Sequence, residues 1–497
     1  MRLRKVTLWI VALVSTTLTH VGAFSLSGPF ATWMTPEIGY RLHPDSTSAP
    51  MLLGEEYRWN LPVITYGFDP SFEAWFGAAG KAEIEAAITI LNSLPPADAL
   101  DPATYPESVR DIGNATAAQV GILDLRSHAL GALLELLGLG NAEQSVWTIR
   151  QALNLPNSSR YLLQSRNHSP VDGRPTNRVN AVSFTYSVTH TASPGPVGRV
   201  SLSAIDPLAQ HPTAAGGFAA PLGEYFPQQR GQILTGLSRD DVGGLRYLLA
   251  TANRNIELLP PGVTDTNGGN GHVDLALRPG VNQVRFQAMP FDTEIAQSSP
   301  VTNYFEDRYF AGATLVTQRV MRIMSCPDIV FSAAEWLNAS GMLDPIRLRF
   351  GTRTNLARFN SAVESDGPGV IFPGCVVTFN KAYLEQFNSH PFALDQRSAT
   401  GGWLWGSITG PATVTATFPP VAQGVAPLTL SPSFLSSVPE IQWLIIGRAG
   451  EPMYVESSED LARWQPEAVT SGASVIVDLR LPWTTNWSAR FFRVRRE

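Results

Sequence analysis

The chain has 497 residues and a formal net charge of −6, and this length favours two to four domains. Apolar residues make up 44% and charged residues 16% of the chain, so large cores can form and a wholly disordered chain is excluded. No block of Lys or Arg accompanies the acidic balance, which argues against a nucleic-acid partner. Gly (41) and Pro (38) are frequent, as is typical of a turn-rich and strand-rich exported protein.

The N-terminal segment, residues 1–23, has the pattern of an export signal. The basic stretch MRLRK precedes the apolar run TLWIVALVSTTL, and small residues follow at Val21-Gly22-Ala23. This order predicts a signal peptide that is cleaved after Ala23. The alternative is an uncleaved anchor, but the run is shorter than the ~20 apolar residues that span a bilayer. We therefore expect a secreted, cell-surface or periplasmic protein with no transmembrane segment after cleavage.

Segments after residue 24 alternate between strand and helix patterns. LPVITYGFDP (61–70) predicts a strand, because β-branched and aromatic residues lie between two prolines. GKAEIEAAITILNSLPP (80–96) predicts an amphipathic helix that ends at the proline pair. LRSHALGALLELLGLGN (125–141) predicts a leucine-rich helix, and NAEQSVWTIRQALNLP (141–156) a further short helix.

The following segments become richer in strands. AVSFTYSVTH (181–190) and VGRVSLSAI (197–205) predict strands, and LSRDDVGGLRYLLATANRN (237–255) predicts a helix. Ser238 is a good N-cap for that helix, and Asp240 and Asp241 favour its dipole. Strands are also predicted in four later segments: HVDLALRPGVNQVRFQAM with a Pro-Gly turn at 279–280, VTNYFEDRYF, TLVTQRVMRIM and GCVVTFN.

We therefore expect a multidomain protein in which an α/β domain precedes β-rich domains. Residues 24–258 form the α/β domain, and residues 259–271 are a linker rich in Gly, Pro and Asn. Residues 272–429 form a β-rich middle domain. Residues 430–497 contain several short strands separated by turns, which indicate a small immunoglobulin/fibronectin-like β-sandwich.

The two cysteines, Cys326 and Cys375, are predicted to form a disulfide, since paired cysteines in an oxidising compartment are usually bridged. The alternative is two buried, unpaired thiols. Neither cysteine lies in a CxxC motif or a Cys/His cluster, so structural zinc or thiol catalysis has little support.

The segment GALLELLGLGN (131–141) overlays the motif H-E-x-x-H-x-x-G-x-x-H of the metzincin zinc proteases, with Gly138 in register. In that motif the histidines bind zinc and the glutamate activates the metal-bound water. The three ligand positions here hold Gly131, Glu135 and Asn141, and the general-base position holds Ala132. Glycine has no side chain to offer, and Asn is a poor zinc ligand.

The surrounding sequence resembles the matrixin branch of these proteases over roughly residues 55–250. RWNLPVITYGFD followed by IEAAITILN is similar to the first matrixin strand and helix, and LSRDDVGGLRYLL to the last helix. The resemblance implies a zincin-like fold that lacks its zinc ligands, with no metal and no other cofactor. The chain also departs from the family in lacking any Met between Met51 and Met289, and matrixins carry a Met-turn beneath the metal.

The C-terminal unit resembles a module that ends many large exported bacterial proteins. The pattern consists of Tyr454, Ser458, Asp460, Leu461 and Trp464, followed by Arg490-Phe491-Phe492-Arg493-Val494. That resemblance implies export, anchoring or display and does not imply catalysis.

Residues 124–138 place Asp124, His128 and Glu135 within about an 80° stripe of a helix that is otherwise leucine-rich. They could line a remnant cleft, with His168, His190 or His211 added from loops. The simpler interpretation is that His128 and Glu135 pair with each other or with nearby backbone. GxSxG, Walker and GxGxxG motifs are not found.

Our leading hypothesis is an exported, non-catalytic pseudo-metalloprotease that binds an extracellular protein or glycan ligand, for adhesion or display. A metal-dependent hydrolase that uses Asp124, His128 and Glu135 is the alternative. A scaffold that is secreted to engage a partner protein is the third possibility.

Overall fold

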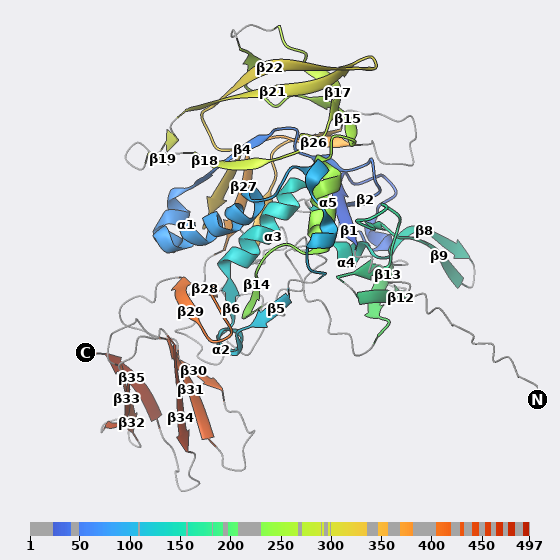
Figure 1. Ribbon diagram of the computed structural model, residues 1–497. Helices are drawn as coiled ribbons and strands as arrows, with labels where there is room; N and C mark the ends of the chain where they lie inside the picture. The colour runs from blue at the N-terminus through green and yellow to red at the C-terminus, as the bar shows by residue number, and fades with distance from the viewer. Residues whose placement is uncertain are drawn as a thin grey trace, which may run out of the picture.

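The computed structural model describes residues 23–40, 49–107, 110–155, 158–180, 182–191, 197–206, 230–266, 271–289, 291–292, 297–298, 300–334, 346–355, 368–380, 404–418, 428–431, 440–446, 453–458, 464–470, 476–482 and 491–496. The predicted signal peptide, apart from Ala23, lies outside these residues. The fold is mixed α/β and strand-rich, with many small sheets and few helices (Figure 1). Within the described part, no helix combines the length and apolarity needed to cross a bilayer.

The centre of the molecule is a five-stranded sheet. Its order is β18 (Arg285–Ala288), β4 (Val63–Phe68), β23 (Ile329–Ser332), β27 (Cys375–Phe379) and β24 (Ile346–Arg349). The first four strands are parallel, and β24 runs antiparallel at the edge. The sequence prediction of a strand within 61–70 is confirmed. A mostly parallel sheet needs cover on both faces, which explains why β4 is buried along most of its length.

Helices α1 (Pro70–Asn92) and α3 (Leu125–Leu137) pack against each other and share the main core with the central sheet (Figure 1). The prediction of a helix in 80–96 is confirmed, but α1 begins ten residues earlier, at Pro70, two residues after the end of β4. The Asp69 carboxylate accepts a hydrogen bond from the N–H of Phe72 (2.9 Å) and so caps this earlier start. Gly77, with φ 57°, then kinks the helix.

Helix α5 (Arg239–Leu249) confirms the predicted helix within 237–255. Ser238 and Asp241 form a reciprocal capping box, in which each side chain accepts from the other residue's backbone N–H. The first strand, β1 (Phe24–Gly28), lies beside this helix and is buried throughout. It pairs with β2 (Ala49–Met51), β7 (Leu139–Gly140) and β10 (Asn167–His168).

The expected domain boundary at 259–271 does not separate two folding units. Strand β4 pairs with β18 and β23 from the other side of that boundary. In the same way β3 (Tyr57–Arg58) pairs with β26 (Gly369–Ile371), and β6 (Ile122–Asp124) pairs with β28 (Leu404–Ile408). Residues 24–258 and 272–429 therefore complete each other's sheets and share one core. The sequence division fails because local patterns do not show which strands pair at long range.

Hydrogen bonds to two buried ion pairs also cross the expected boundary. Arg322 binds Asp328 through two hydrogen bonds (2.6 and 3.0 Å), and the N–H of Thr65 donates to the same carboxylate (2.8 Å). The guanidinium of Arg58 donates to Glu257 (2.7 Å) and to the carbonyl oxygen of Arg278 (3.2 Å). These contacts pin strands that are far apart in sequence.

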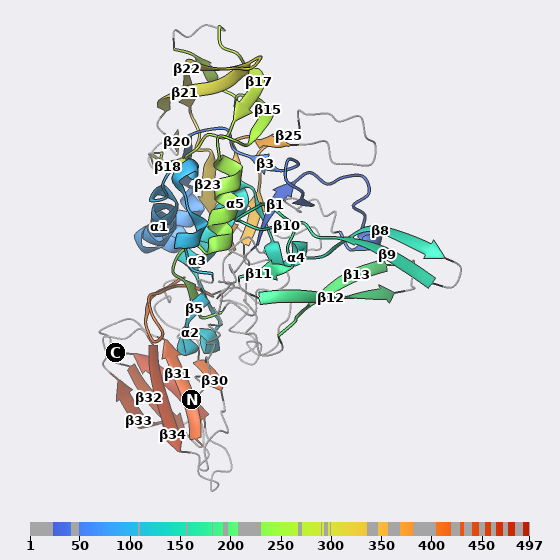
Figure 2. The ribbon, with the colours of Figure 1, turned by 45° about the vertical axis from the view of Figure 1, so that its right-hand side comes forward.

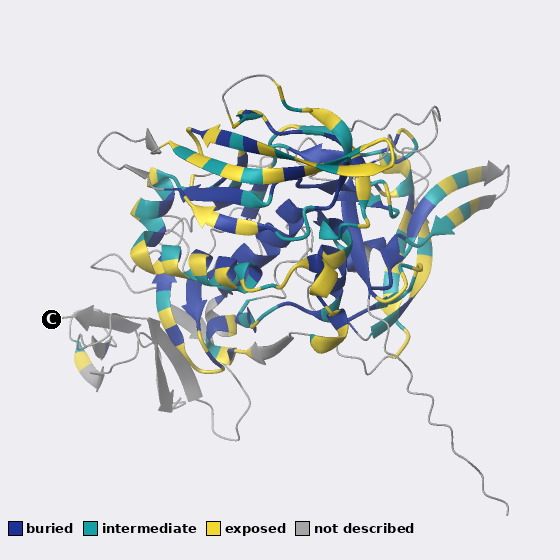
Figure 3. Cartoon of the chain, turned by 45° about the horizontal axis from the view of Figure 1, so that its top comes forward, coloured by how far each residue is buried: buried dark blue, intermediate teal, exposed yellow. Residues whose placement is uncertain are grey.

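A second five-stranded sheet lies over the central sheet in Figure 1. Its order is β15 (Arg254–Leu258), β17 (Leu275–Pro279), β21 (Val301–Ala311), β22 (Thr314–Met324) and β16 (Val263–Asp265). Covered and exposed positions alternate along β21 and β22 (Figure 3). Part of the expected linker belongs to this sheet, since Leu259 and Val263 are buried against Val320.

Two hairpins project from the body, to the right in Figure 2. One pairs β12 (Val182–Thr191) with β13 (Val197–Ala204), and both strands are predicted from the sequence. The other pairs β8 (Thr148–Leu155) with β9 (Ser158–Gln164). The helix predicted within 141–156 is therefore wrong beyond its first turn, α4 (Ala142–Ser145), because the following segment gains cross-strand partners that its local helical pattern does not reveal.

The remaining elements are short. They are η1 (Pro36–Ile38), η2 (Ala97–Ala99), η3 (Pro102–Thr104), α2 (Ala115–Val120), β5 (Arg110–Gly113), β11 (Arg178–Val179), β14 (Gln232–Leu234), β19 (Phe291–Asp292), β20 (Gln297–Ser298), β25 (Arg353–Asn355) and β29 (Val414–Phe418).

The C-terminal part contains two three-stranded antiparallel sheets, side by side in Figures 1 and 2. One is β30 (Leu428–Ser431), β31 (Glu440–Ile446) and β34 (Ile476–Pro482), and the other is β33 (Gln465–Thr470), β32 (Met453–Ser458) and β35 (Phe491–Arg496). A strand-rich C-terminal unit is therefore present.

Candidate functional site

Helix α3 carries the candidate site, and Asp124 fixes its start. Asp124 Oδ2 accepts hydrogen bonds from the N–H (2.9 Å) and hydroxyl (2.5 Å) of Ser127, which caps the helix. The N–H of Ile408, on β28, donates to the other oxygen, Oδ1 (3.0 Å). Burial raises the pKa of Asp124, and these hydrogen bonds lower it. Asp124 Oδ2 thus caps α3, and Oδ1 ties the start of the helix to β28.

The C-terminal end of α3 is fixed by the close contact of Gly138 with the backbone of Tyr57. Gly138 adopts a left-handed conformation (φ 110°), and its N–H donates to the carbonyl oxygen of Glu135 (3.0 Å). A Cβ at this position would lie 2.3 Å from the carbonyl oxygen of Tyr57. The glycine that matches the metzincin motif is therefore required here by the C-cap and by the neighbouring chain.

Every residue of α3 except Arg126 is buried. The leucines of the helix that the sequence predicts within 125–141 include Leu133, Leu134 and Leu137, and all three are buried. The expected narrow polar stripe is covered by other elements and faces no solvent.

His128 is held as a buried, neutral side chain. Its Nδ1 lies 2.6 Å from the carbonyl oxygen of Asp124, and its ring meets the Trp405 ring edge-on at 5.3 Å between centroids. Burial lowers the pKa of His128 to about 4, and the contact with the Asp124 carbonyl opposes this shift. The simpler interpretation from the sequence, contact with nearby backbone, holds for His128.

This environment predicts a specific pH dependence of stability. The pKa of His128 is about 4 in the folded chain and near 6.5 when unfolded. The stability that this difference contributes is present above pH 6.5, and about 3 kcal/mol of it is lost as the pH falls to 4. His128→Asn keeps an N–H donor near the Asp124 carbonyl but cannot be protonated. The free energy of unfolding, measured with urea, should therefore fall between pH 7 and pH 4 by about 3 kcal/mol less in the variant than in the native protein. An equal fall in unfolding free energy in both proteins would contradict the lowered pKa of His128.

Glu135 occupies a ligand position of the motif, but its charged neighbour is an arginine. Burial lowers the pKa of Arg353, on β25, to about 10, whereas Tyr57, then Glu135 and Cys375, raise it. The Arg353 guanidinium also lies 3.3 Å from the centroid of the Phe350 ring. The negative charge of Glu135 is thus placed in the field of a fixed cation.

The remaining candidates do not converge on Glu135. Asp124 and Glu135 are eleven residues apart on one helix, which is about 16 Å along its axis. Gly131 is buried, and the carbonyl oxygen of Asn141 accepts from the Ser145 hydroxyl (2.6 Å). No cluster of three His, Cys, Asp or Glu side chains suited to a metal occurs in the described part of the chain.

The loop histidines are dispersed. His168 is buried, with Nε2 3.2 Å from the carbonyl oxygen of Met51, and burial lowers its pKa. His190 is exposed on its hairpin, where Nδ1 lies 2.5 Å from the Tyr161 hydroxyl. His211 lies outside the described residues.

The predicted disulfide is not formed. Cys326 is an exposed free thiol, and Cys375 is a free thiol buried in β27. The Cys375 sulfur accepts from the N–H of Gly351 (3.4 Å), and burial raises its thiol pKa to about 11. Strand pairing places Cys375 opposite Ile329, three residues beyond Cys326.

Two residues that organise this region, Arg353 and Trp405, could not be assigned from the motif. They lie more than 200 residues beyond α3 in the chain. Their sequence neighbourhoods carry no metzincin-like pattern, and only long-range strand pairing brings them to the helix.

Comparison with known proteins gives no family for this chain: no family model matches it, and neither does any curated protein or solved structure.

Proposed function

We propose that the protein is an exported, non-catalytic pseudo-metalloprotease whose role is to bind an extracellular protein or glycan ligand, in adhesion or display. The observation that carries this proposal is that Asp124, His128 and Glu135 have structural contacts. Asp124 caps α3 and binds β28, His128 packs as a neutral ring, and Glu135 lies near Arg353. Each side chain that could act in catalysis is engaged in holding the fold.

The chemistry of a zinc hydrolase supports the same conclusion. Such a site needs three protein ligands and an open position for water, and a base beside that water. Gly131, Ala132 and Asn141 stand at three of the four positions of the motif. Burial of α3 on nearly all sides also leaves little room for a peptide to approach the helix.

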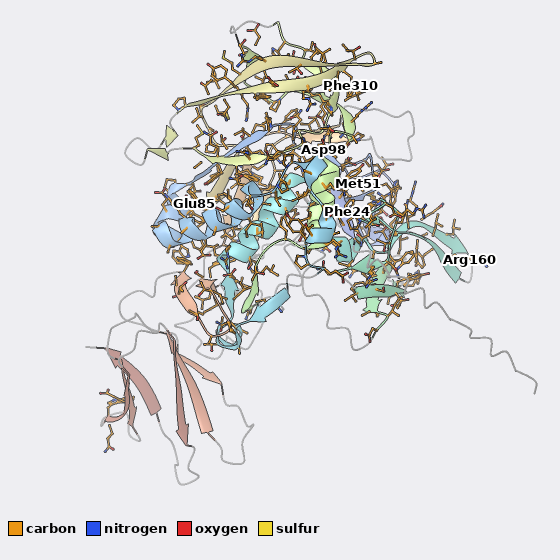
Figure 4. The ribbon with its side chains drawn as sticks, in the orientation of Figure 1. Phe24, Met51, Glu85, Asp98, Arg160 and Phe310 are labelled. Carbon is orange, nitrogen blue, oxygen red and sulfur yellow. The ribbon has the colours of Figure 1, made fainter. Side chains whose placement is uncertain are left out.

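The outer face of the second sheet is the best candidate for a binding surface. The strand register places Ile256, Leu277, Phe310 and Leu315 in one row across four strands. Tyr304, 65% exposed, and Ile323, 55% exposed, extend the same face in the strand register. Phe310 is labelled on this sheet in Figure 4. Exposed aromatic and aliphatic side chains on a rigid sheet are common at protein and glycan interfaces.

The C-terminal unit completes the proposal. Its two antiparallel sheets agree with a small immunoglobulin/fibronectin-like sandwich, and its sequence pattern resembles a module of exported bacterial proteins. We propose that it serves anchoring or display.

The alternative, a metal-dependent hydrolase using Asp124, His128 and Glu135, needs these side chains to meet one ion. No contact among the described residues favours that arrangement. The test is hydrolysis of unfolded protein substrates, such as denatured casein, by the mature chain. We expect no hydrolysis that EDTA stops, and no difference between the native chain and Glu135→Gln. Chelator-sensitive cleavage that is lost in Glu135→Gln would establish the hydrolase instead.

A further inference from the structure

Apolar side chains form two clusters on the outer face of the second sheet, which is the side opposite to the buried Asp307. The strand register places Phe310 beside Leu277 and Leu315 on this face, and every second residue along each strand shares it. The first cluster consists of Ile256, Leu277, Phe310 and Leu315. The second cluster, toward the other end of β21 and β22, consists of Tyr304, Met321 and Ile323.

Both clusters can be reached from solvent. Leu315, in the first cluster, is 42% exposed, and Tyr304, in the second, is 65% exposed. Phe310, labelled in Figure 4, is partly buried, and the guanidinium carbon of Arg254 lies 4.3 Å from its ring centroid. Large apolar side chains that gather on one exposed face are typical of an interaction surface, whereas isolated ones are ordinary surface residues.

The strip between the two clusters is a charged band with a positive balance. It contains the exposed Arg308 on β21 and the exposed Arg319 on β22. Its one carboxylate, Glu306, lies opposite Arg319, whereas Arg308 lies opposite the uncharged Thr317. With Arg254, which is also exposed, the outer face carries three arginines and one glutamate. The whole chain has a net charge of −6, so the outer face is a cationic surface on an acidic protein.

The charged side chains beneath the sheet leave this positive balance in place. Arg278 forms an ion pair with Asp307 (2.9 Å), and Arg322 forms one with Asp328 (2.6 Å); all four side chains are buried. Each of these pairs is neutral in sum. The electrostatic potential above the sheet is therefore set mainly by the exposed arginines, and it attracts an acidic ligand.

The distance between the clusters indicates how long that ligand is. Tyr304 and Phe310 are six residues apart on β21, which is about 20 Å along a strand. An extended segment of about seven residues, or a helix of about 13 residues, spans the same distance. Sugar rings pack on aromatic faces, but most members of both clusters are aliphatic, and these match the apolar side chains of a protein.

We propose that the outer face docks an acidic, amphipathic segment of an extracellular protein. Apolar side chains of that segment contact the two clusters, and carboxylates between them bind Arg308 and Arg319. The inference rests on the proposed function and selects a protein over a glycan as the ligand. A second copy of this chain is a poor occupant, because its own cationic face would oppose the first.

The probe is a fluorescent peptide of the sequence Gly-Trp-Ser-Asp-Thr-Asp-Ser-Leu-Gly. When it is extended, Trp, both Asp and Leu lie on one side, with Trp and Leu about 20 Å apart. A second peptide carries Lys in place of both Asp. We expect the acidic peptide to bind the mature chain with a Kd on the order of 100 µM, since the contact is small. The lysine peptide should bind about tenfold more weakly. Fluorescence polarisation measures both affinities.

Reversing the charge of the band should reverse this preference. Arg308→Glu combined with Arg319→Glu is expected to weaken binding of the acidic peptide about tenfold and to strengthen that of the lysine peptide by a similar factor. Tyr304→Ser removes an apolar contact and should weaken binding of the acidic peptide about fivefold. Arg160→Glu, on the exposed hairpin of β8 and β9 (Figure 4), is the matched control and should change neither affinity. All these side chains are exposed, so Tm should stay unchanged.

Equal affinities for the two peptides, or an affinity for the acidic peptide that charge reversal leaves unchanged, would overturn the inference. Binding of heparin or of phosphatidylglycerol vesicles through Arg308 and Arg319, without binding of the acidic peptide, would also overturn it, because the ligand would then be a glycan or a lipid. These outcomes leave the non-catalytic role standing. Failure of the proposed function is recognised separately, by casein hydrolysis that EDTA stops and that Glu135→Gln abolishes.

Discussion

Glu257→Leu is expected to destabilise the folded protein by about 3–5 kcal/mol, because it leaves the guanidinium of Arg58 buried without its carboxylate. Arg58 Nε donates to Glu257 Oε1 at 2.7 Å, and neither side chain is more than 1% exposed. Burial raises the pKa of Glu257, and Arg58 is the main influence that lowers it. Arg58 also donates to the carbonyl oxygens of Asn253 (2.8 Å) and Arg278 (3.2 Å), so the lost pair lies where several segments meet.

Urea unfolding of both proteins measures this effect. The surface pair Arg174–Asp172 is the control, because its side chains are 84% and 49% exposed, and Asp172→Ala should leave the midpoint almost unchanged. The double variant Arg58→Met with Glu257→Leu should regain part of the loss, since no isolated charge remains. A Glu257→Leu chain as stable as the native protein would show that the pair is open to water.

Leu133→Asp is expected to abolish cooperative folding. Leu133 is fully buried in the main core, within the helix that touches both α1 and the sheet of β28. An unpaired carboxylate there loses its hydration without any compensating partner, and the side chain also loses its apolar contacts. Circular dichroism and thermal melting of the mature chain should show no cooperative transition.

Leu133→Met is the matched control, because it nearly conserves volume and polarity and should cost less than about 1.5 kcal/mol. A soluble Leu133→Asp protein that melts cooperatively would mean that this face of α3 is open to solvent. That outcome would also weaken the proposed function, which depends on α3 acting as core.

Much of the secondary structure near the candidate site follows from local pattern. The β-branched run of β4, the apolar spacing of α1 and the Ser238 cap of α5 each specify their element with few residues. The leucines of α3 likewise show that this helix is buried on nearly all sides. The local sequence pattern was sufficient to predict these elements, because the hydrogen bonds and the burial within each element match that pattern.

The long-range arrangement could not be obtained in this way. Nothing in the VITYGF run of β4 indicates that its neighbours come from residues 285–288 and 329–332, so the boundary at 259–271 was misplaced. The environment of Glu135 depends on Arg353, and that of His128 on Trp405. The cysteine pair failed for the same reason, since an even count gives no information on strand register.

Zinc content of the purified mature protein tests the central claim most directly. Tight zinc sites need about three strong side-chain ligands, and the motif on α3 offers Glu135 alone, in the field of Arg353. Elemental analysis after dialysis should find well under one equivalent of zinc, and EDTA should leave Tm unchanged. One equivalent of zinc that survives dialysis, lowers Tm when EDTA removes it, and is lost in His128→Asn or Glu135→Gln would contradict the account.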